Sequence, residues 1–154
     1  MTKAVKEYLV KSLASGQFVS GQLLGEQLGI SRTAIAKHIK ALTEMGLDIY
    51  SVTGKGYKLA QPLYLLEKDK IISFLVNEAS KQTEKQSDLP LVEVHSLIDS
   101  TNDYLMRRLP NQVSPGQVCL AEYQSAGRGR RGRQWISPFG SQIYLSMYWY
   151  LEQG

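Results

Sequence analysis

The sequence predicts an α+β protein in which an N-terminal winged helix-turn-helix precedes a mixed α/β domain. Two observations lead to this prediction. Apolar residues repeat with helical spacing through the first 45 residues, and a short glycine-containing turn separates the second and third helices. After residue 90, apolar and polar residues alternate with the period of two that is typical of strands. We expect a DNA-binding domain at 1–60, a linker at 61–66 and a second domain at 67–154.

Composition narrows the class of protein. Apolar residues make up 43% of the chain and charged residues 21%, which is typical of soluble globular proteins. No apolar run approaches the ~18 residues of a membrane helix, and the first residues lack a signal-peptide core. The single cysteine, Cys119, lies in a strand pattern and is expected to be a small buried hydrophobe. These features predict a cytoplasmic protein with no membrane partner.

The excess positive charge is confined to the first third of the chain. Residues 1–60 hold eight Lys/Arg and four Asp/Glu, a net charge of 8 − 4 = +4, and residues 61–154 hold ten of each kind. Because basic surfaces attract phosphate backbones, this distribution indicates a nucleic-acid partner for the first domain. The sequence has no cluster of His and Cys, which excludes a structural zinc site.

Three helices and a hairpin are expected in the first domain. Ser31 is a good N-cap for the third helix, and the sequence Thr-Gly-Lys-Gly at 53–56 is typical of a hairpin turn, which would form the wing. The expected helices are Thr2–Ser15, Gln22–Leu28 and Arg32–Met45, and the expected strands are Asp48–Val52 and Gly56–Leu59.

The third helix has an apolar face and a polar face. Ile35, Ile39 and Leu42 have the spacing of a buried stripe. The polar face, the start of the helix and the tip of the wing supply the candidate DNA contacts, which are Ser31, Arg32, Thr33, Lys37, Lys40 and Lys55. Alternatively, these residues are only the solvated side of a helical scaffold. His38 lies beside them and either touches DNA or is an ordinary surface histidine.

The second domain combines helices and strands. A polar segment at 81–90 is expected to be a surface loop. Asp-Ser-Thr-Asn at 99–102 offers N-caps for a helix that follows. The expected elements are a helix at Glu67–Ser80, a strand at Leu91–His95, a helix at Asp103–Leu109, a strand at Val118–Tyr123 and a long strand at Gln142–Leu151.

An arginine- and glycine-rich loop lies within Ala121–Trp135. Its members are Gly127, Arg128, Gly129, Arg130, Arg131, Gly132 and Arg133. Arginine presents a planar fork of donors to carboxylate or phosphate, and glycine permits positive φ and close approach of backbone N–H groups to an anion. Because like charges repel, we expect the empty loop to be mobile and to order around an anionic ligand. A solvated basic loop and an Arg/Gly RNA-binding segment are the alternatives, but strands on both sides favour a ligand site.

Two motifs together resemble the signature of biotin protein ligases: Asp-Ser-Thr-Asn at 99–102 and Gly-Arg-Gly-Arg-Arg-Gly-Arg-Gln-Trp at 127–135. With a helix-turn-helix in front, the chain resembles the bifunctional kind, which is both biotin ligase and biotin operon repressor. The resemblance implies a class II synthetase-like catalytic domain of the biotin ligase type. Such ligases continue with further strands, a lysine important for catalysis and a small C-terminal barrel, so we expect this chain to be a C-terminally truncated, N-terminal portion.

The resemblance also implies roles for individual residues. The implied biotin-binding residues are Ser100, Thr101, Asn102, Gln124, Arg128, Gly129 and Arg130. Arg130 is also the implied catalytic residue, and it would bind nucleotide together with Arg131 and Arg133. From the residues alone, helix capping is sufficient to explain the polar run at 99–102. Trp135 either walls the ligand pocket or belongs to the core.

The implied reaction is that of a biotin–[acetyl-CoA-carboxylase] ligase. Biotin and ATP, with Mg²⁺, would form biotinyl-5′-AMP, and the biotinyl group would pass to a lysine of the biotin carboxyl carrier protein. The adenylate-loaded protein would form a homodimer that binds operator DNA. The sequence identifies no magnesium ligand, and truncation puts catalysis in doubt. A ligand-sensing repressor without ligase activity is the alternative.

Overall fold

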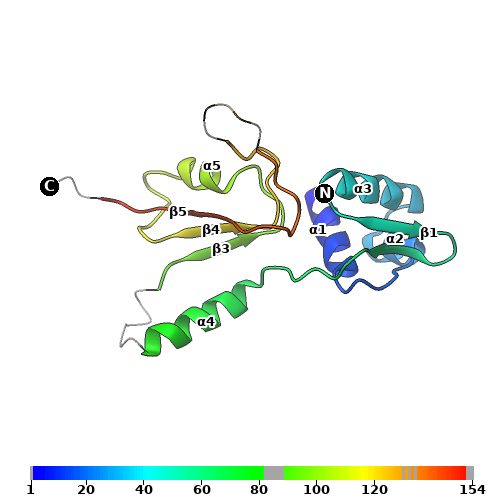
Figure 1. The fold of residues 1–154 in the computed structure, drawn as a ribbon, viewed down its shortest axis with the longest axis horizontal. Helices are drawn as coiled ribbons and strands as arrows, with labels where there is room; N and C mark the ends of the chain where they lie inside the picture. Colours follow the sequence, from blue (N-terminus) through cyan, green and yellow to red (C-terminus); the bar gives the residue numbers. More distant parts are fainter. Residues whose placement is uncertain (1, 82–88, 130, 132, 134, 152–154) are drawn as a thin grey trace. The chain divides into compact units, whose positions relative to one another are not determined.

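The computed structural model describes residues 2–81, 89–129, 131, 133 and 135–151. The chain folds into two compact units (Figure 1). The first is Met1–Leu65 with Pro138–Gly140, and the second is Leu66–Ser137 with Ser141–Gly154. No helix among the described residues has both the length and the apolar character that a membrane crossing requires.

The first unit consists of three helices and one antiparallel hairpin, as predicted. The elements are α1 (Thr2–Leu13), α2 (Gly21–Leu28), α3 (Arg32–Glu44), β1 (Ile49–Val52) and β2 (Gly56–Leu59). Their apolar faces meet in a single core that includes Leu9, Leu13, Leu24, Ile35, Ile39, Leu42 and Leu59. The apolar stripe predicted for the third helix is therefore confirmed.

Caps and a glycine set the turn between α2 and α3. Gly29 ends α2 with φ +64°, and the N–H of Ile30 donates to the carbonyl of Gly25 at 2.9 Å. Ser31 then caps α3, because its hydroxyl accepts from the N–H of Ala34 at 3.2 Å. The result is a short, fixed connection that places the start of α3 at the surface.

The wing is attached to the segment that precedes α2. Val19 and Tyr57 exchange two backbone hydrogen bonds of 2.8 and 2.9 Å. At the neighbouring Gly56, φ is +102° and a Cβ would collide with the carbonyl of Val19. Glycine is therefore required at this position for both its conformation and its lack of a side chain.

The described residues of the second unit form a three-stranded sheet and two helices. Its elements are α4 (Lys68–Lys81), β3 (Val92–His95), α5 (Thr101–Met106), β4 (Val118–Ala121) and β5 (Tyr144–Met147). The sheet order is β3-β4-β5, with β3 parallel to β4 and β5 antiparallel to β4. Helix α5 packs against β4 and β5, and α4 contacts β3 (Figure 1). Cys119 lies at 0% exposure in the middle strand, as predicted.

Several predicted elements end one to three residues away from the observed ends, among them β4, which ends at Ala121 rather than Tyr123, and α5, which ends at Met106 rather than Leu109. Helix α5 begins at Thr101 rather than Asp103, because Ser100 is the residue that caps it. The strand predicted over Gln142–Leu151 is wrong in length, since β5 covers four residues. Its partner β4 also has four residues, and beyond it the described residues form one further pair of backbone bonds, between Tyr148 and the 116–117 segment. A strand needs a partner to continue, so alternation alone overestimated its length.

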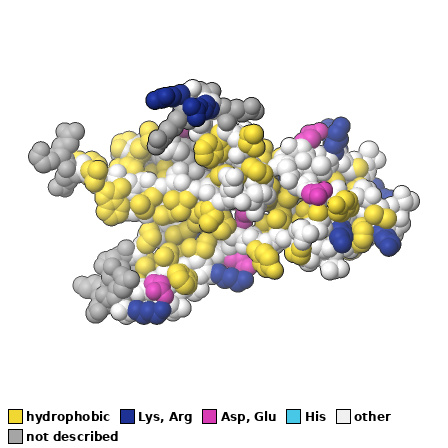
Figure 2. All heavy atoms as spheres, viewed as in Figure 1, with side chains coloured by type: hydrophobic (Ala, Val, Ile, Leu, Met, Phe, Trp, Pro, Cys, Tyr) yellow, Lys and Arg dark blue, Asp and Glu magenta, His cyan; other side chains and the backbone are white. Residues whose placement is uncertain are grey.

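The alternating side chains of this strand do not divide into a buried and a polar face in the expected way. Tyr144 is buried, whereas Leu145 and Met147 are 55% and 57% exposed. Hydrophobic side chains are accordingly visible over the strands of this unit in Figure 2. The described strands thus leave one apolar row of β5 uncovered.

Candidate functional site

The parallel pairing of β3 and β4 brings two distant motifs together. Beyond the strands, the N–H of Ile98 donates to Tyr123, and the N–H groups of Ser125 and Ala126 donate to Ile98 and Asp99, at 2.8–3.1 Å. Because both strands run in the same direction, the segments that follow them lie at the same edge of the sheet. The 99–102 motif and the start of the Arg/Gly loop are therefore neighbours. Ligands bind at such carboxyl ends in many open sheets.

A pocket of about 320 Å³ lies at this edge. Five of the predicted site residues line it together with five residues of the loop end and β5. The lining residues are Ser100, Thr101, Asn102, Gln124, Arg128, Trp135, Ile143, Tyr144, Leu145 and Ser146. The pocket thus combines hydroxyl, amide and guanidinium groups with an apolar wall. The four lining residues at 143–146 were not predicted, because their place depends on the β4–β5 pairing.

Thr101 and Gln124 fix each other across the pocket. The backbone N–H and the hydroxyl of Thr101 both donate to Oε1 of Gln124, at 2.8 and 3.1 Å. The Thr101 hydroxyl also lies 2.8 Å from the hydroxyl of Ser146. Thr101 is 3% exposed, so these bonds form in a largely dry place. Since the Gln124 carbonyl is occupied, its amide nitrogen is left as a donor for a ligand.

The 99–102 segment caps α5 and lines the pocket at once. The Ser100 hydroxyl accepts from the N–H of Asp103 at 3.3 Å, and Ser100 is 3% exposed. Asp99 accepts the N–H of Ser100 at 2.8 Å and holds both terminal nitrogens of Arg107, at 2.6 and 3.2 Å. The bonds from Arg107 and Ser100 lower the pKa of Asp99 to about 2. Capping and ligand binding are therefore compatible explanations of the motif.

Helix α5 is also held from its far end. Glu93 on β3 accepts hydrogen bonds from Tyr104 at 2.6 Å, from Arg108 at 2.5 Å and from Gln117 at 2.5 Å. Burial raises the pKa of Glu93, but the bonds from Tyr104 and Arg108 outweigh it and hold the pKa below its usual value. A charged Glu93 thus anchors the helix whose first turn lines the pocket.

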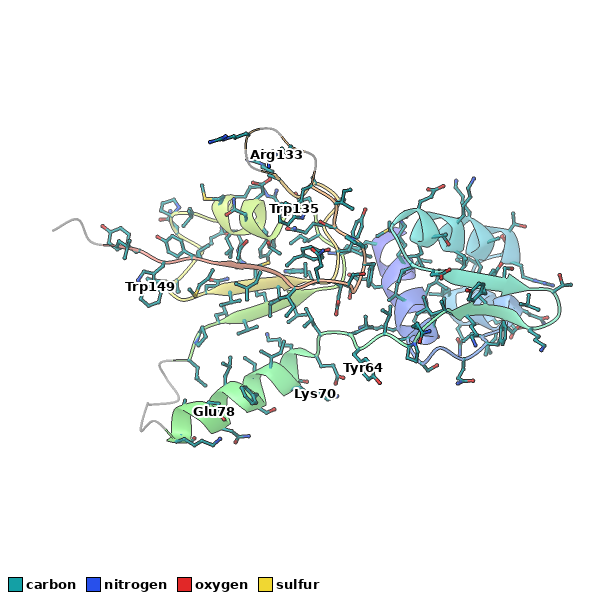
Figure 3. The ribbon with its side chains drawn as sticks, in the orientation of Figure 1. Tyr64, Lys70, Glu78, Arg133, Trp135 and Trp149 are labelled. Atoms are coloured by element: carbon teal, nitrogen blue, oxygen red, sulfur yellow. The ribbon has the colours of Figure 1, made fainter. Side chains whose placement is uncertain are left out.

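Residues of the Arg/Gly loop take different places. Arg128 lines the pocket and pairs with Asp103 at 2.8 Å. Gly129 is half-buried, while Arg131 and Arg133 are exposed and do not line the pocket; Arg133 extends outward from the loop (Figure 3). Arg130, Gly132 and Gln134 lie outside the described residues. The predicted role of Arg130 and the predicted ordering of the loop around an anion therefore stay predictions.

The two described glycines of this loop, Gly127 and Gly129, have a different role from the one we predicted. At Gly127 a Cβ would collide with the Trp135 ring and approach Nε2 of Gln124 to 3.1 Å, and at Gly129 it would collide with the carbonyl of Arg133. Neither glycine has positive φ, and the positive value falls on Arg131, at 58°. Close approach, rather than a left-handed backbone, thus requires glycine here. Trp135 is 47% exposed and walls the pocket, so it is not a core residue.

Among residues 2–81, 89–129, 131, 133 and 135–151, no group of three His, Cys, Asp or Glu side chains could hold a metal ion.

All six candidate DNA contacts are exposed in the first unit. They are Ser31, Arg32, Thr33, Lys37, Lys40 and Lys55. Since Ile35 and Ile39 on the opposite face of α3 are buried, the polar face of this helix points to solvent. His38 is half-buried between the two faces. An exposed polar face over a buried apolar stripe is expected of a recognition helix, and the DNA contacts stay predictions.

A hollow of about 400 Å³ lies beside the wing. Arg32 at the start of α3 and Lys55 at the tip of the wing both line it, together with the first residues of α2. Lys55 and Lys58 lie 5.8 and 5.6 Å above the ring of Phe18, a cation–π distance. The structure thus places two of the predicted DNA contacts, Arg32 of α3 and Lys55 of the wing, at one hollow.

Comparison with known proteins gives a match in each half of the chain. Residues 6–58 match the family described as HTH domain, and residues 94–154 match the Biotin/lipoate A/B protein ligase family. "Bifunctional ligase/repressor BirA" of Salmonella typhimurium is 51% identical over 95% of this chain and 42% of its own length. The proteins of the same name from Escherichia coli and Bacillus subtilis are 49% and 32% identical, over 95% and 88% of this chain.

The chain spans about two-fifths of the length of these curated relatives. The family matches agree with the two motifs and with the order of the two units. Residues 6–58 are thus similar to helix-turn-helix domains, and residues 94–154 are similar to members of the biotin/lipoate A/B protein ligase family.

Proposed function

We propose that the pocket of the second unit binds biotin and that the chain contributes to a biotin protein ligase that also represses transcription. The observation that carries the proposal is that one pocket is lined by five of the predicted residues, Ser100, Thr101, Asn102, Gln124 and Arg128. It is supported by relatives whose name is bifunctional ligase/repressor. Within this proposal, residues 1–60 are the DNA-binding domain, 61–66 the linker and 67–154 the start of the catalytic domain.

The pocket has the chemistry that biotin requires. The ureido ring is neutral and needs both donors and acceptors, which the Ser100 and Asn102 side chains and the Gln124 amide supply. The apolar atoms of the ligand suit the wall formed by Trp135 and Leu145. The carboxylate requires a cation at the rim. Among the arginines that the structure describes, Arg128 lines the pocket and can supply this charge.

The proposed reaction has two steps. A carboxylate oxygen of biotin attacks the α-phosphorus of ATP, a new P–O bond forms, and the bond to pyrophosphate breaks. The amine of a lysine on the biotin carboxyl carrier protein then attacks the acyl carbon, releasing AMP and a proton. Because the first step joins two anions, fixed positive charge lowers its barrier, and we assign this to Arg130, Arg131 and Arg133 with Mg²⁺ on the phosphates.

The first unit would bind operator DNA. Ser31, Thr33 and Arg32 stand at the exposed start of α3, and Lys37, Lys40 and Lys55 supply phosphate contacts. Since operators recognised by such domains are two-fold symmetric, we propose that the adenylate-loaded protein binds as a homodimer. The proposal places the protein in the cytoplasm, where both ATP and a bacterial promoter are found.

The direct test is adenylate formation from biotin and ATP labelled at the α-phosphate. We expect label in biotinyl-5′-AMP, and its loss when Gln124→Ala removes the amide from the pocket. The matched control is Gln112→Ala, an exposed amide in the second unit that does not line the pocket. Biotin binding without adenylate would show that this chain alone is not a ligase and would favour a ligand-sensing repressor. RNA binding that survives deletion of residues 1–60, without biotin binding, would favour the Arg/Gly RNA-binding alternative.

A further inference from the structure

We propose that Asp103 is a positioning residue of the pocket, whose carboxylate holds the Arg128 guanidinium at the rim before a ligand binds. The inference rests on the proposed function, because it concerns how the same pocket receives the carboxylate of biotin. Neither of the two sequence motifs includes Asp103, which follows Asn102 directly. The ion pair between the two residues carries the proposal.

Asp103 is a fixed anchor. It lies in the first turn of α5, and its backbone N–H donates to the hydroxyl of Ser100 at 3.3 Å. Its side chain is 18% exposed, so packing around the helix limits the conformations it can adopt. The helix is held in turn by Glu93 through Tyr104 and Arg108. A charge on this helix therefore has a defined position relative to the pocket.

Arg128 is the exposed partner of the pair. Its side chain is 74% exposed, and its Nη2 lies 2.8 Å from Oδ2 of Asp103. A free arginine loses much rotamer entropy when it binds a ligand, and neighbouring loop arginines repel it. The bond to Asp103 orders Arg128 in advance. It uses one of five N–H donors, so the guanidinium keeps donors for an anion in the pocket that it lines.

The position of the pair argues against a purely structural role. An exposed ion pair adds little to global stability. Arg128, by contrast, is the second residue of the Arg/Gly loop, and its side chain lines the pocket. Fixing it therefore acts on the entrance of the loop. Loss of the ion pair should therefore weaken the binding of ligands that carry a carboxylate and leave the binding of other ligands unchanged.

The test is calorimetric titration of the intact protein with biotin and with biotinamide, in which an amide replaces the carboxylate. We expect Asp103→Asn to weaken biotin binding about fivefold, the range of an exposed pair, and to leave biotinamide binding unchanged. Arg128→Gln should have the same selectivity, and the double variant should be no weaker than Arg128→Gln alone. The matched control is Glu78→Gln, which removes an acid paired with Lys81 at 2.6 Å on α4.

Two results would overturn the inference. Unchanged or tighter biotin binding by Asp103→Asn would mean that the carboxylate is idle or competes with the ligand. Equal weakening of biotin and biotinamide would mean that the substitution disturbs the pocket as a whole. Either result leaves the proposed function intact, because wild-type binding of biotin decides that separately.

A second measurement needs no ligand. Amide hydrogen exchange at residues 125–129 should be faster in Asp103→Asn than in wild type and unchanged in Glu78→Gln. Arg128→Lys removes the planar fork from the exposed side without altering α5, and it should give the same increase. If both variants exchange at the wild-type rate, the pair does not order the loop entrance and the inference is wrong, whether or not biotin binds.

Discussion

The Thr101 hydroxyl is the most constrained polar group of the pocket. It contacts both Gln124 and Ser146 and is almost fully buried. Thr101→Val keeps the shape of the side chain but leaves both partners without this bond. We expect the second unit to lose about 1–2 kcal/mol of stability and biotin binding to weaken, because Gln124 then keeps only the hydrogen bond from the backbone N–H of residue 101. Urea unfolding and biotin titration measure the two effects.

The control for this substitution is Thr43→Val on α3. The Thr43 hydroxyl is exposed and donates to the carbonyl of Ile39 in its own helix, at 3.1 Å. Its removal should change neither quantity by a measurable amount. If Thr101→Val were equally silent, the hydrogen bonds across the pocket would have no energetic weight.

Asp99 predicts a pH dependence. Its pKa in the folded protein is about 2, below the ordinary value of 3.8, because Arg107 and the N–H of Ser100 bind the charged form. The stabilisation is therefore present above about pH 4 and is lost as the pH falls towards 2. Since the pair is exposed and solvent screens it, we expect about 1 kcal/mol. Asp99→Asn should cost this much at pH 7 and almost nothing near pH 2, by urea unfolding at each pH; a constant difference would contradict the assignment.

Some residues of the pocket could be predicted from the sequence and others could not. Ser100, Thr101, Asn102, Gln124 and Arg128 stand in local motifs, and the structure brings all five to one pocket. Ser146 carries no local signal, because its contact with Thr101 spans 45 positions and exists only through strand pairing. Asp103 has the appearance of an ordinary residue in the first turn of a helix. Contacts of this kind become visible only in three dimensions.

At the scale of elements, the wing depends on one glycine. Gly56→Ala forces a Cβ against the Val19 carbonyl at a φ of +102°, and should destabilise the first unit by at least about 2 kcal/mol. Gly54→Ala provides the control, because Gly54 also has positive φ, +80°, but open space around it. Its cost should be about 1 kcal/mol. Thermal unfolding of both variants tests this; equal losses would show that the close approach to Val19 carries no weight.

Helix α3 and the wing should account for the salt dependence of DNA binding. Each phosphate contact contributes about −0.9 to the slope of log affinity against log salt. Lys40→Ala should therefore weaken operator binding and make the slope shallower by about 1. Lys11→Ala, an exposed lysine at the end of α1, is the control and should leave the slope unchanged. Identical slopes for the two variants, measured by fluorescence anisotropy, would remove α3 from the interface.

Element ends were predictable where a cap sets them and unpredictable where a partner does. Ser31 and Gly29 determine their helix ends locally, and the sequence located both ends within a residue or two. The length of β5 depends instead on β4, which ends after four residues. Period-two alternation continues beyond the last paired residue, so the pattern could not reveal where pairing stops.

At the scale of the whole molecule, two compact units carry two separate chemistries. A basic surface of helix and wing residues lies on the first, and a polar pocket with an apolar wall lies at the edge of the sheet of the second. The charge distribution predicted this division, since the net positive charge lies in residues 1–60. What it could not predict is the parallel pairing of β3 with β4, which joins the two ligand motifs.

Hydrogen exchange with and without biotin tests the central claim most directly. If the pocket binds biotin, protection of backbone amides from exchange should rise in two separate segments, 98–103 and 123–129. It should stay unchanged in α3 and the wing, which do not contact the ligand. The same pattern should disappear in Gln124→Ala. Protection confined to other segments, or none at a biotin concentration that saturates the known relatives, would contradict the assignment of this pocket.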